Sequence, residues 1–362
     1  MKRITLITNG GIGDAVHVIP SIKCIRSHFG PDVELILQAV IHDSAATKPH
    51  LTLADKILLP LDLVNKVCLS RYGISNILSR WWNRIHFSLS VVGWVLNPTI
   101  DLVIFLLPDP PNSRRMRLLN LLSRLSSRIF LPRPITQEKR SFERSPFAWQ
   151  LLDSVSRTLS ADMSRVANDT PLITLPDSAV READRWLCAN RRYPDRWLLA
   201  VCPGASNPSN EWPTERFINL LLRLQDQTQL EIVLVGGSTD LHLCQEIAWR
   251  CPGVLDACGA LTILGSAALF RRTRLMVGLD TGTTHLASAC GVPYVALYGQ
   301  RGAGRKFFPP FAKGVVLRQP VPCRGCGLHV CDQEGHPCMT GINVDDVLNA
   351  VIQVASISVS AA

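Results

Sequence analysis

The sequence predicts an α/β protein of two doubly wound domains, each a parallel sheet covered by helices on both faces. The chain has 362 residues, which is enough for two domains that each bury a core. Apolar residues make up 47% and charged residues 19%, a globular rather than a disordered composition. Short apolar runs alternate with amphipathic segments, which is the pattern of parallel strands joined by helices.

In the first half, residues 4–8 form an apolar run that meets a glycine-rich turn, and a helix is expected from residue 15 onward. Further strands are expected at residues 33–38 and 101–107, where the apolar runs are short and continuous. A helix is expected at residues 147–160. Strand, turn and helix in this order indicate a parallel sheet.

The second half repeats the alternation after proline-containing segments around residues 169–177. We therefore predict domains at residues 1–170 and 171–362, the second with a cysteine-rich loop at 323–338 and a C-terminal helix. Its helices and strands are expected at residues 179–190, 197–202, 214–225, 231–235, 241–249, 275–279, 284–290 and 294–298. Open parallel sheets bind ligands at the carboxyl ends of their strands, so we expect a central cleft that both domains face.

The net charge of +9 is concentrated in the first half, where residues 1–170 carry 21 Lys and Arg against 13 Asp and Glu. Such a charge attracts an anionic partner, and nucleic acid, an anionic membrane surface and a phosphorylated substrate all fit. The first residues have too short an apolar stretch for a secretory signal. The apolar segment at 91–107 is interrupted too early to span a membrane. We expect a cytoplasmic protein without a transmembrane helix.

A glycine-rich turn at residues 9–14 precedes the first helix and ends in Gly13 and Asp14. Asp14 has two interpretations. It caps the helix, where a carboxylate interacts well with free amides and the helix dipole. Alternatively, it lies at the rim of the cleft and accepts a proton from an incoming hydroxyl. The turn does not have the GxGxxG spacing of a dinucleotide site.

Two later turns offer groups that bind anions. Residues 203–206 follow a strand with small side chains, and Ser206 suits a phosphate, although a plain turn explains the segment equally well. Residues 280–285 join a strand to a helix and contain Asp280, Thr281, Gly282 and His285. Hydroxyls and free amides at a helix N-terminus form a site fit for a diphosphate, with simple helix capping as the alternative.

Two further features leave alternatives open. Asp240 lies in a turn that leads into a helix, where it either caps the helix or reaches a ribose hydroxyl. Four of the twelve cysteines are closely spaced within the loop, and they either hold zinc or iron as a structural clamp or remain thiols or a labile disulfide. These four are Cys323, Cys326, Cys331 and Cys338.

The motifs GGIGDAVHVIP, PGAS before WP, and DTGTTHLASACGVPYVALYG occur in this order in the sequence. Together they resemble glycosyltransferase family 9, the heptosyltransferases, and the resemblance extends from residue 4 to about residue 350. It implies a GT-B architecture of two Rossmann-like domains, an ADP-heptose donor, inversion at the anomeric carbon, and no cofactor or metal in catalysis. Some members have similar cysteine clusters, and a related branch binds iron there.

By position, Asp14 resembles the family's general base, and Asp280, Thr281 and Gly282 resemble its donor-diphosphate loop. His285 follows in the same motif, and Ser206 matches a hydroxyl that contacts phosphate. Where the family usually has a lysine that meets the nucleotide phosphates, two residues before the Trp-Pro pair, this chain has Asn210. Arg216 or an arginine of the first domain would then have to supply the positive charge.

The resemblance implies that the first domain binds the acceptor, an anionic lipopolysaccharide core or related glycan, at the cytoplasmic face of the inner membrane. The second domain binds the nucleotide sugar, and nucleic acid is not a partner. Two alternatives remain: a sugar-nucleotide epimerase of the same architecture, and a non-catalytic protein that binds a sugar nucleotide or lipid.

Overall fold

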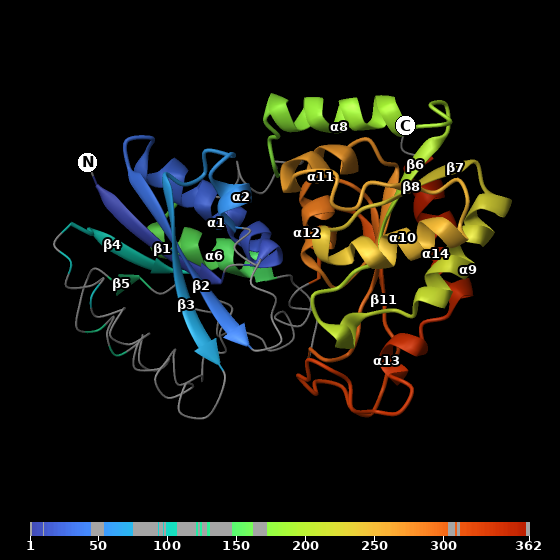
Figure 1. The fold of residues 1–362 in the computed structure, drawn as a ribbon. Coiled ribbons are helices and arrows are strands. Elements are labelled where there is room, and N and C mark those ends of the chain that lie inside the picture. Colours follow the sequence, from blue (N-terminus) through green and yellow to red (C-terminus); the bar gives the residue numbers. More distant parts are fainter. Residues whose placement is uncertain are drawn as a thin grey trace. The chain divides into compact units, whose positions relative to one another are not determined.

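The structure, a computed structural model, divides the chain into two compact units, Met1–Asp169 and Thr170–Ala362 (Figure 1). It describes residues 2–9, 11–44, 54–74, 93, 97, 99–106, 121, 124, 129–130, 147–161, 172–302, 308–309 and 312–359.

The first unit contains a five-stranded sheet in the order β3-β2-β1-β4-β5, with every neighbouring pair parallel. In the register of the three central strands, Leu6 is opposite both Leu37 and Ile104, and all three side chains are buried. The strands are β1 (Arg3–Asn9), β2 (Glu34–Ser44), β3 (Lys66–Ile74), β4 (Leu102–Phe105) and β5 (Ile129–Phe130).

Helices α1 (Ile12–Phe29), α2 (Ala54–Leu58) and α6 (Phe147–Leu159) belong to this unit, and α1 packs against both others. Along α1, Val18, Ile22 and Ile25 are fully buried at the spacing of one helix face. The helix ends before Gly30, whose φ of 86° is a conformation that glycine adopts without strain.

The second unit contains a six-stranded sheet, also parallel throughout, in the order β11-β10-β9-β6-β7-β8. Its strands are β6 (Trp197–Cys202), β7 (Leu230–Leu234), β8 (Leu255–Asp256), β9 (Leu275–Leu279), β10 (Tyr294–Leu297) and β11 (Gly314–Leu317). In the central strand β9 all five residues are buried, as expected for a strand that is covered on both faces.

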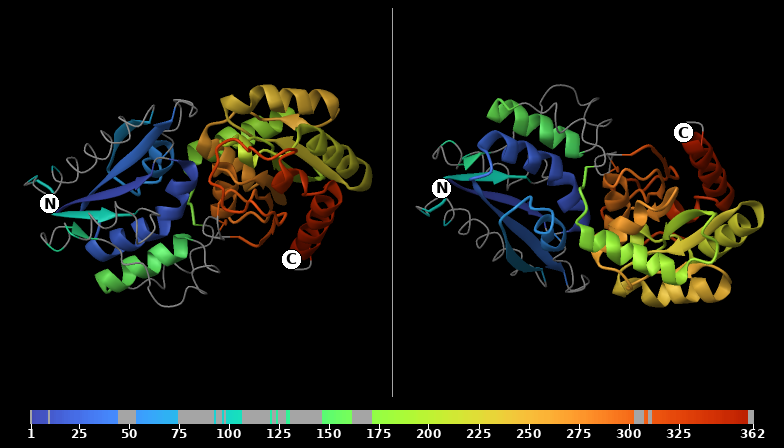
Figure 2. Two further views of the ribbon diagram at one scale, coloured as in Figure 1. Left: turned by 90° about the horizontal axis from the view of Figure 1, so that it is seen from below. Right: turned by 90° about the horizontal axis from the view of Figure 1, so that it is seen from above.

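Helices cover both faces of this sheet (Figure 2). Val201, Leu234 and Val277 share one core with α9, α10 and α14. The intervening strand residues, such as Ala200 and Met276, point to the opposite face, where α11 contacts α8 and α12. The helices are α8 (Asp177–Asn190), α9 (Thr214–Gln227), α10 (Leu241–Arg250), α11 (Ile263–Phe270), α12 (Gly282–Ala289), α13 (Pro337–Thr340) and α14 (Val344–Val359), with short turns η1 (Pro208–Asn210) and η2 (Ser238–Asp240).

The predicted α/β class with two parallel sheets is confirmed. Several elements were not predicted, among them β3, β5, β8, β11, α2, α11 and α13. β8 has two residues, and β11 is an edge strand that is only partly buried, so neither has the continuous apolar run of a central strand. The first helix begins at Ile12 rather than at residue 15, and the strand expected at 101–107 is the shorter β4.

None of the helices among the described residues combines the length and the apolar character that crossing a membrane requires. Residues 91–92, 94–96, 98 and 107 of the apolar segment at 91–107 lie outside the described residues, and there the expectation stays a prediction.

A buried carboxylate connects β7 to the turn before β6. The Glu231 side chain, only 1% exposed, accepts a hydrogen bond from Arg191 Nε at 2.8 Å. It also accepts from the backbone amides of Arg192 at 2.7 Å and Tyr193 at 3.2 Å. Because an ionised carboxylate is costly to bury without such donors, this arrangement fixes the chain entering the central strand β6.

We expect Glu231→Ala to lower the free energy of unfolding by about 3 kcal/mol, because Arg191 and two amides lose their buried acceptor. Urea unfolding followed by circular dichroism measures this change. The matched control is Glu246→Ala, which removes a more exposed carboxylate 3.7 Å from Arg250 and should cost about 0–1 kcal/mol. Equal costs for the two variants would contradict the role given to Glu231.

Candidate functional site

Loops from distant parts of the sequence converge at the carboxyl edge of the second sheet. Because β6, β9 and β10 are adjacent and parallel, the segments that follow them emerge at the same edge. They are residues 203–210 after β6, residues 280–283 after β9 and residues 298–302 after β10. The motif residues at 206, 210 and 280–282 therefore lie on one edge of one sheet.

Asp280 is the centre of a polar cluster at this edge. Asn210 Nδ2 donates to the Asp280 carbonyl oxygen at 3.2 Å and to its carboxylate at 3.4 Å. Burial raises the pKa of Asp280 to about 6, and this effect outweighs the nearby charges of Arg301 and Arg318 and the hydrogen bonds from Asn210 and Tyr298, which all lower it. The carboxyl group can therefore gain or lose its proton close to neutral pH.

The two guanidinium groups beside Asp280, those of Arg301 and Arg318, are held by hydrogen bonds to nearby residues of the same protein. Arg301 donates from Nε to the Leu328 carbonyl at 2.9 Å and from Nη2 to the Gly327 carbonyl at 3.2 Å. Arg318 donates from Nη2 to Gln300 Oε1 at 2.6 Å. Sequence reasoning singled out neither arginine. The signal available was that Arg301 closely follows β10, which is the neighbour of β9 in the sheet.

Arg216, which the sequence suggested as a substitute cation, has a different role. Its Nη1 donates to the Ile342 carbonyl oxygen, which also accepts from the Trp212 indole. This contact holds α9 to the turn before α14, so the cations placed beside Asp280 are Arg301 and Arg318.

Asn210 is 2% exposed, and its side-chain oxygen has no hydrogen-bond partner among the described residues. That oxygen faces Gly299, where an added Cβ would approach it to 3.2 Å. The cysteine-rich loop holds the same segment in place, because Ser209 N donates to the His329 carbonyl at 3.1 Å and His336 Nε2 lies 3.0 Å from the Ser209 carbonyl oxygen. The loop therefore supports the segment that carries Asn210.

The N-terminus of α12 follows Asp280 directly. Thr281 is the N-cap residue, and its side chain makes no capping hydrogen bond. Gly282 opens the helix, and its amide, like the first amides of any helix, has no partner within the helix. Thr284 is instead tied to the strand, because its hydroxyl donates to the Leu279 carbonyl at 2.6 Å. These free amides and the helix dipole make this turn favourable for an anion.

His285, expected to bind the donor, lies in the interior instead. It is 4% exposed, and burial lowers its pKa to about 4, so the imidazole is neutral at physiological pH. The side chain of His285, four residues past the N-cap, packs in the interior, which the motif alone did not reveal. Donor binding by His285 stays a prediction.

Asp240 and Ser206 lie in the loops after β7 and β6. The Asp240 carboxylate accepts from the Gly237 amide at 2.9 Å and so closes the turn at the start of α10. It also packs so closely against Gly204 that a Cβ there would collide with it. Ser206 is exposed. Only glycine fits at position 204, because the Asp240 carboxylate leaves no room for a side chain. Ser206, by contrast, is accessible to a ligand.

Asp14 belongs to the first unit, in the first turn of α1. The N-cap is Gly11, and an added Cβ at Gly11 would lie 3.0 Å from Asp14 Oδ2. The carboxylate therefore folds back over the turn, where the helix dipole favours its charge. Gly13 lies in the same helical turn rather than in a loop. Both interpretations of Asp14 remain compatible with this position.

The four cysteines of the loop differ in exposure: Cys338 is buried, Cys326 is exposed, and Cys323 and Cys331 are intermediate. Burial raises the pKa of the Cys338 thiol, and the charges of the other three raise it further. The thiols are thus near one another. However, no three of the four lie within 4.8 Å of one another, which metal ligands would require. A metal at this loop stays a prediction.

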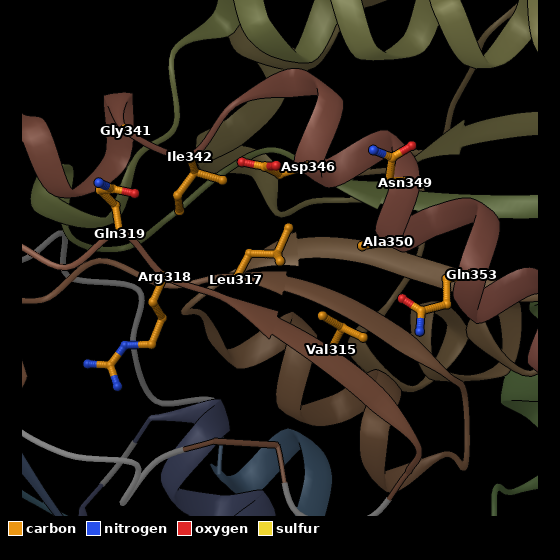
Figure 3. A pocket seen from close by; sticks show the side chains of 10 residues that line it. All are labelled: Val315, Leu317, Arg318, Gln319, Gly341, Ile342, Asp346, Asn349, Ala350 and Gln353. Carbon is orange, nitrogen blue, oxygen red and sulfur yellow. The ribbon is translucent and has the colours of Figure 1, made fainter.

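A cavity of about 250 Å³ lies between β11 and α14 (Figure 3). Leu317, Asp346 and Asn349 are among its lining residues. Figure 3 shows the guanidinium group of Arg318 pointing away from the α14 side chains. Arg318 therefore lies at the border between this cavity and the cluster around Asp280, and the motif loops are not part of the cavity lining.

Comparisons with known proteins show what the chain is similar to. The model of glycosyltransferase family 9 (heptosyltransferase) matches residues 155–325. The chain is 29% identical over 187 residues to lipopolysaccharide heptosyltransferase 2 of Escherichia coli strain K12, which covers 47% of this chain and 52% of that protein. The chain thus spans about half the length of the curated relatives that it matches.

Solved structures share the fold over nearly the whole chain. A family 9 glycosyl transferase from Veillonella parvula superposes with a TM-score of 0.67 at 16% identity and covers 98% of both chains. An E. coli heptosyltransferase with ADP-2-deoxy-2-fluoro heptose superposes with a TM-score of 0.57 at 15% identity, covering 97% of this chain and 99% of the other. The two parallel α/β regions and these neighbours agree with the GT-B fold. Residues 155–325 of the chain are thus similar to glycosyltransferase family 9, the heptosyltransferase family.

Proposed function

We propose that this chain is a glycosyltransferase that transfers heptose from ADP-heptose to a lipopolysaccharide core or related glycan. The match of residues 155–325 to the family 9 model and the names of the matched relatives support this proposal. The observation that carries it is the cluster around Asp280, where two guanidinium groups and the free amides of α12 lie at one sheet edge. Positive groups in this arrangement suit a nucleoside diphosphate, which is both donor and leaving group.

In the proposed reaction, the diphosphate lies against the N-terminus of α12, and Arg301 and Arg318 balance its charge. These groups act most strongly as the sugar–phosphate bond breaks, because the negative charge on the leaving diphosphate then increases. Arg301 thereby replaces the lysine for which this chain has Asn210. The buried side-chain oxygen of Asn210 accepts a hydrogen bond from the nucleotide sugar, which would give this oxygen the partner that it otherwise lacks among the described residues.

Asp14 supplies the other half of the chemistry in this proposal. As general base it removes the proton of the acceptor hydroxyl while that oxygen attacks the anomeric carbon. Attack from the face opposite the diphosphate inverts the configuration, and the step proceeds without a metal. The excess of positive charge in residues 1–170 suits an anionic glycolipid acceptor, and hence attachment to the cytoplasmic face of the inner membrane.

The direct test incubates the protein with ADP-heptose, with and without a lipopolysaccharide precursor, and measures ADP release. We expect release that depends on the acceptor, and Asp14→Asn should reduce its rate roughly 10²- to 10⁴-fold through loss of the base. Asp32→Asn, which changes an exposed carboxylate of the same unit, is the control and should keep the rate. Release without acceptor would favour an epimerase. Normal turnover by Asp14→Asn would exclude Asp14 as the base.

The charge of Arg301 can be tested separately. Arg301→Gln should weaken ADP binding roughly 10- to 100-fold, because a charge-assisted contact to the diphosphate is lost. Calorimetric titration with ADP measures the affinity, and Arg324→Gln, at an exposed position of the neighbouring loop, is the control. Adding Asn210→Lys to Arg301→Gln should restore much of the affinity by returning a cation to the same cluster. Unchanged ADP affinity in Arg301→Gln would overturn the assignment.

The pKa of Asp280 predicts a pH dependence of stability. Its folded-state pKa of about 6 lies above the ordinary value of 3.8, so the native state binds the proton more tightly. The stabilisation from this group is fully present below about pH 3.8 and is lost as the pH rises through about 6. Asp280→Asn should therefore raise the free energy of unfolding at pH 8 by on the order of 2 kcal/mol, and should change it little at pH 3.5.

Urea unfolding of both proteins at the two pH values measures this difference. Asp195→Asn, at an exposed position before β6, serves as the control and should show no comparable dependence on pH. If Asp280→Asn lowered the free energy of unfolding at pH 8, burial of the ionised carboxylate would not destabilise the protein, and the prediction would be wrong.

A further inference from the structure

Three potential metal ligands meet beside the loop after β7. They are Cys244 on α10, Asp256 at the end of β8, and Cys258 just beyond it. The two sulfur atoms and a carboxylate oxygen all lie within 4.8 Å of one another, and no other group of three such ligands occurs in the described part of the chain. Both cysteines are buried, whereas Asp256 is partly exposed.

Backbone hydrogen bonds hold these ligand atoms in place. Asp256 Oδ1 accepts from the Cys258 amide at 2.9 Å, which leaves the second carboxylate oxygen for another partner. The Cys258 thiol lies 3.2 Å from the Gly237 carbonyl oxygen. An added Cβ at Gly236 would approach the same sulfur to 3.0 Å and Asp240 Oδ2 to 2.9 Å. Asp240 is therefore next to the cluster.

The charges around Cys244 favour a bound cation. A hydrogen bond with Cys258 raises the pKa of the Cys244 thiol, and burial and the charges of Cys258, Asp256 and Asp240 raise it further. In the described residues, neither Asp240 nor Asp256 forms an ion pair with a lysine or arginine. Two thiols and two carboxylates, counting the neighbouring Asp240, thus lie together without an ion pair to any lysine or arginine of the described residues.

The spacing and the ligand types suit zinc. With Zn–S bonds of about 2.3 Å and Zn–O bonds of about 2.0 Å, tetrahedral ligand atoms lie roughly 3.5–3.8 Å apart. The three ligand atoms lie no more than 4.8 Å apart, so small side-chain movements bring them to this spacing. Two sulfurs select a thiophilic cation over Mg²⁺ or Ca²⁺, which prefer oxygen ligands.

We propose that Cys244, Asp256 and Cys258 form a binding site for a thiophilic divalent cation of the zinc type, separate from the cysteine-rich loop at 323–338. Each thiol releases its proton to solvent when the cation binds, and water or Asp240 completes the tetrahedron. The cation would join α10 to the loop after β8. Because Cys258 contacts Gly237, it would also brace the turn that carries Asp240.

The test uses a full-length chain in which Cys323, Cys326 and Cys331 are replaced by serine, so that the loop cannot chelate a metal. Under anaerobic, reducing conditions this chain is titrated with Zn²⁺ and with Co²⁺, whose thiolate charge-transfer band reports sulfur ligation. We expect one zinc per chain with submicromolar affinity and a rise in Tm on binding. In the same background, Cys244→Ser and Cys258→Ser should each abolish the cobalt–thiolate band and the rise in Tm.

The matched control is Cys251→Ser, which changes another buried cysteine, at the end of the same helix, that does not belong to the cluster. It should keep both signals. Asp256→Asn should keep the sulfur ligation but weaken zinc binding at least about tenfold. Absence of stoichiometric zinc in the folded background chain would overturn the proposal. Retention of both signals by Cys244→Ser, or isolation of Cys244 and Cys258 as a disulfide that takes up no metal, would overturn it as well.

Discussion

The parallel pairing of β10, β9 and β6 is the constraint on which the candidate site depends. Parallel strands put all their carboxyl ends at one edge, so residues 210, 280 and 301 meet although they are far apart in the sequence. The buried apolar residues of β6 and β9 fix this pairing. Glu231 on β7 fixes the chain segment that leads into β6. Displacing any of these strands would separate the groups that surround Asp280.

Under the proposed function, charge balance at this edge compensates for Asn210, which stands where the resemblance to family 9 leads one to expect a lysine. Asn210 binds Asp280 through its amide, and the nearby positive charges are those of Arg301 and Arg318. Burial makes the ionised form of Asp280 costly, so this carboxylate is a poor partner for the two arginines. Arg301 and Arg318 can instead bind the charge of an anionic ligand. A diphosphate is such an anion, which connects the fold to the proposed transfer reaction.

The sequence predicted the elements whose apolar runs are long and buried, such as β6, β9 and α9, and through them the fold class. It missed β8 and β11, because a two-residue strand and a partly exposed edge strand lack that signal. Asp280 was named as a candidate site residue because of its motif. Naming Arg301 would have required the order of the strands in the sheet, which no local sequence pattern encodes. The burial of His285 was not predicted for the same reason: the motif does not show which side of α12 is packed.

Hydrogen–deuterium exchange with and without ADP tests most directly whether this sheet edge binds a nucleoside diphosphate. ADP should slow amide exchange in residues 203–210, 280–285 and 299–302, and should leave β11 and α14 unchanged, because the cavity between them does not include the motif loops. Protection confined to β11 and α14, or no protection in the second unit at saturating ADP, would contradict the account.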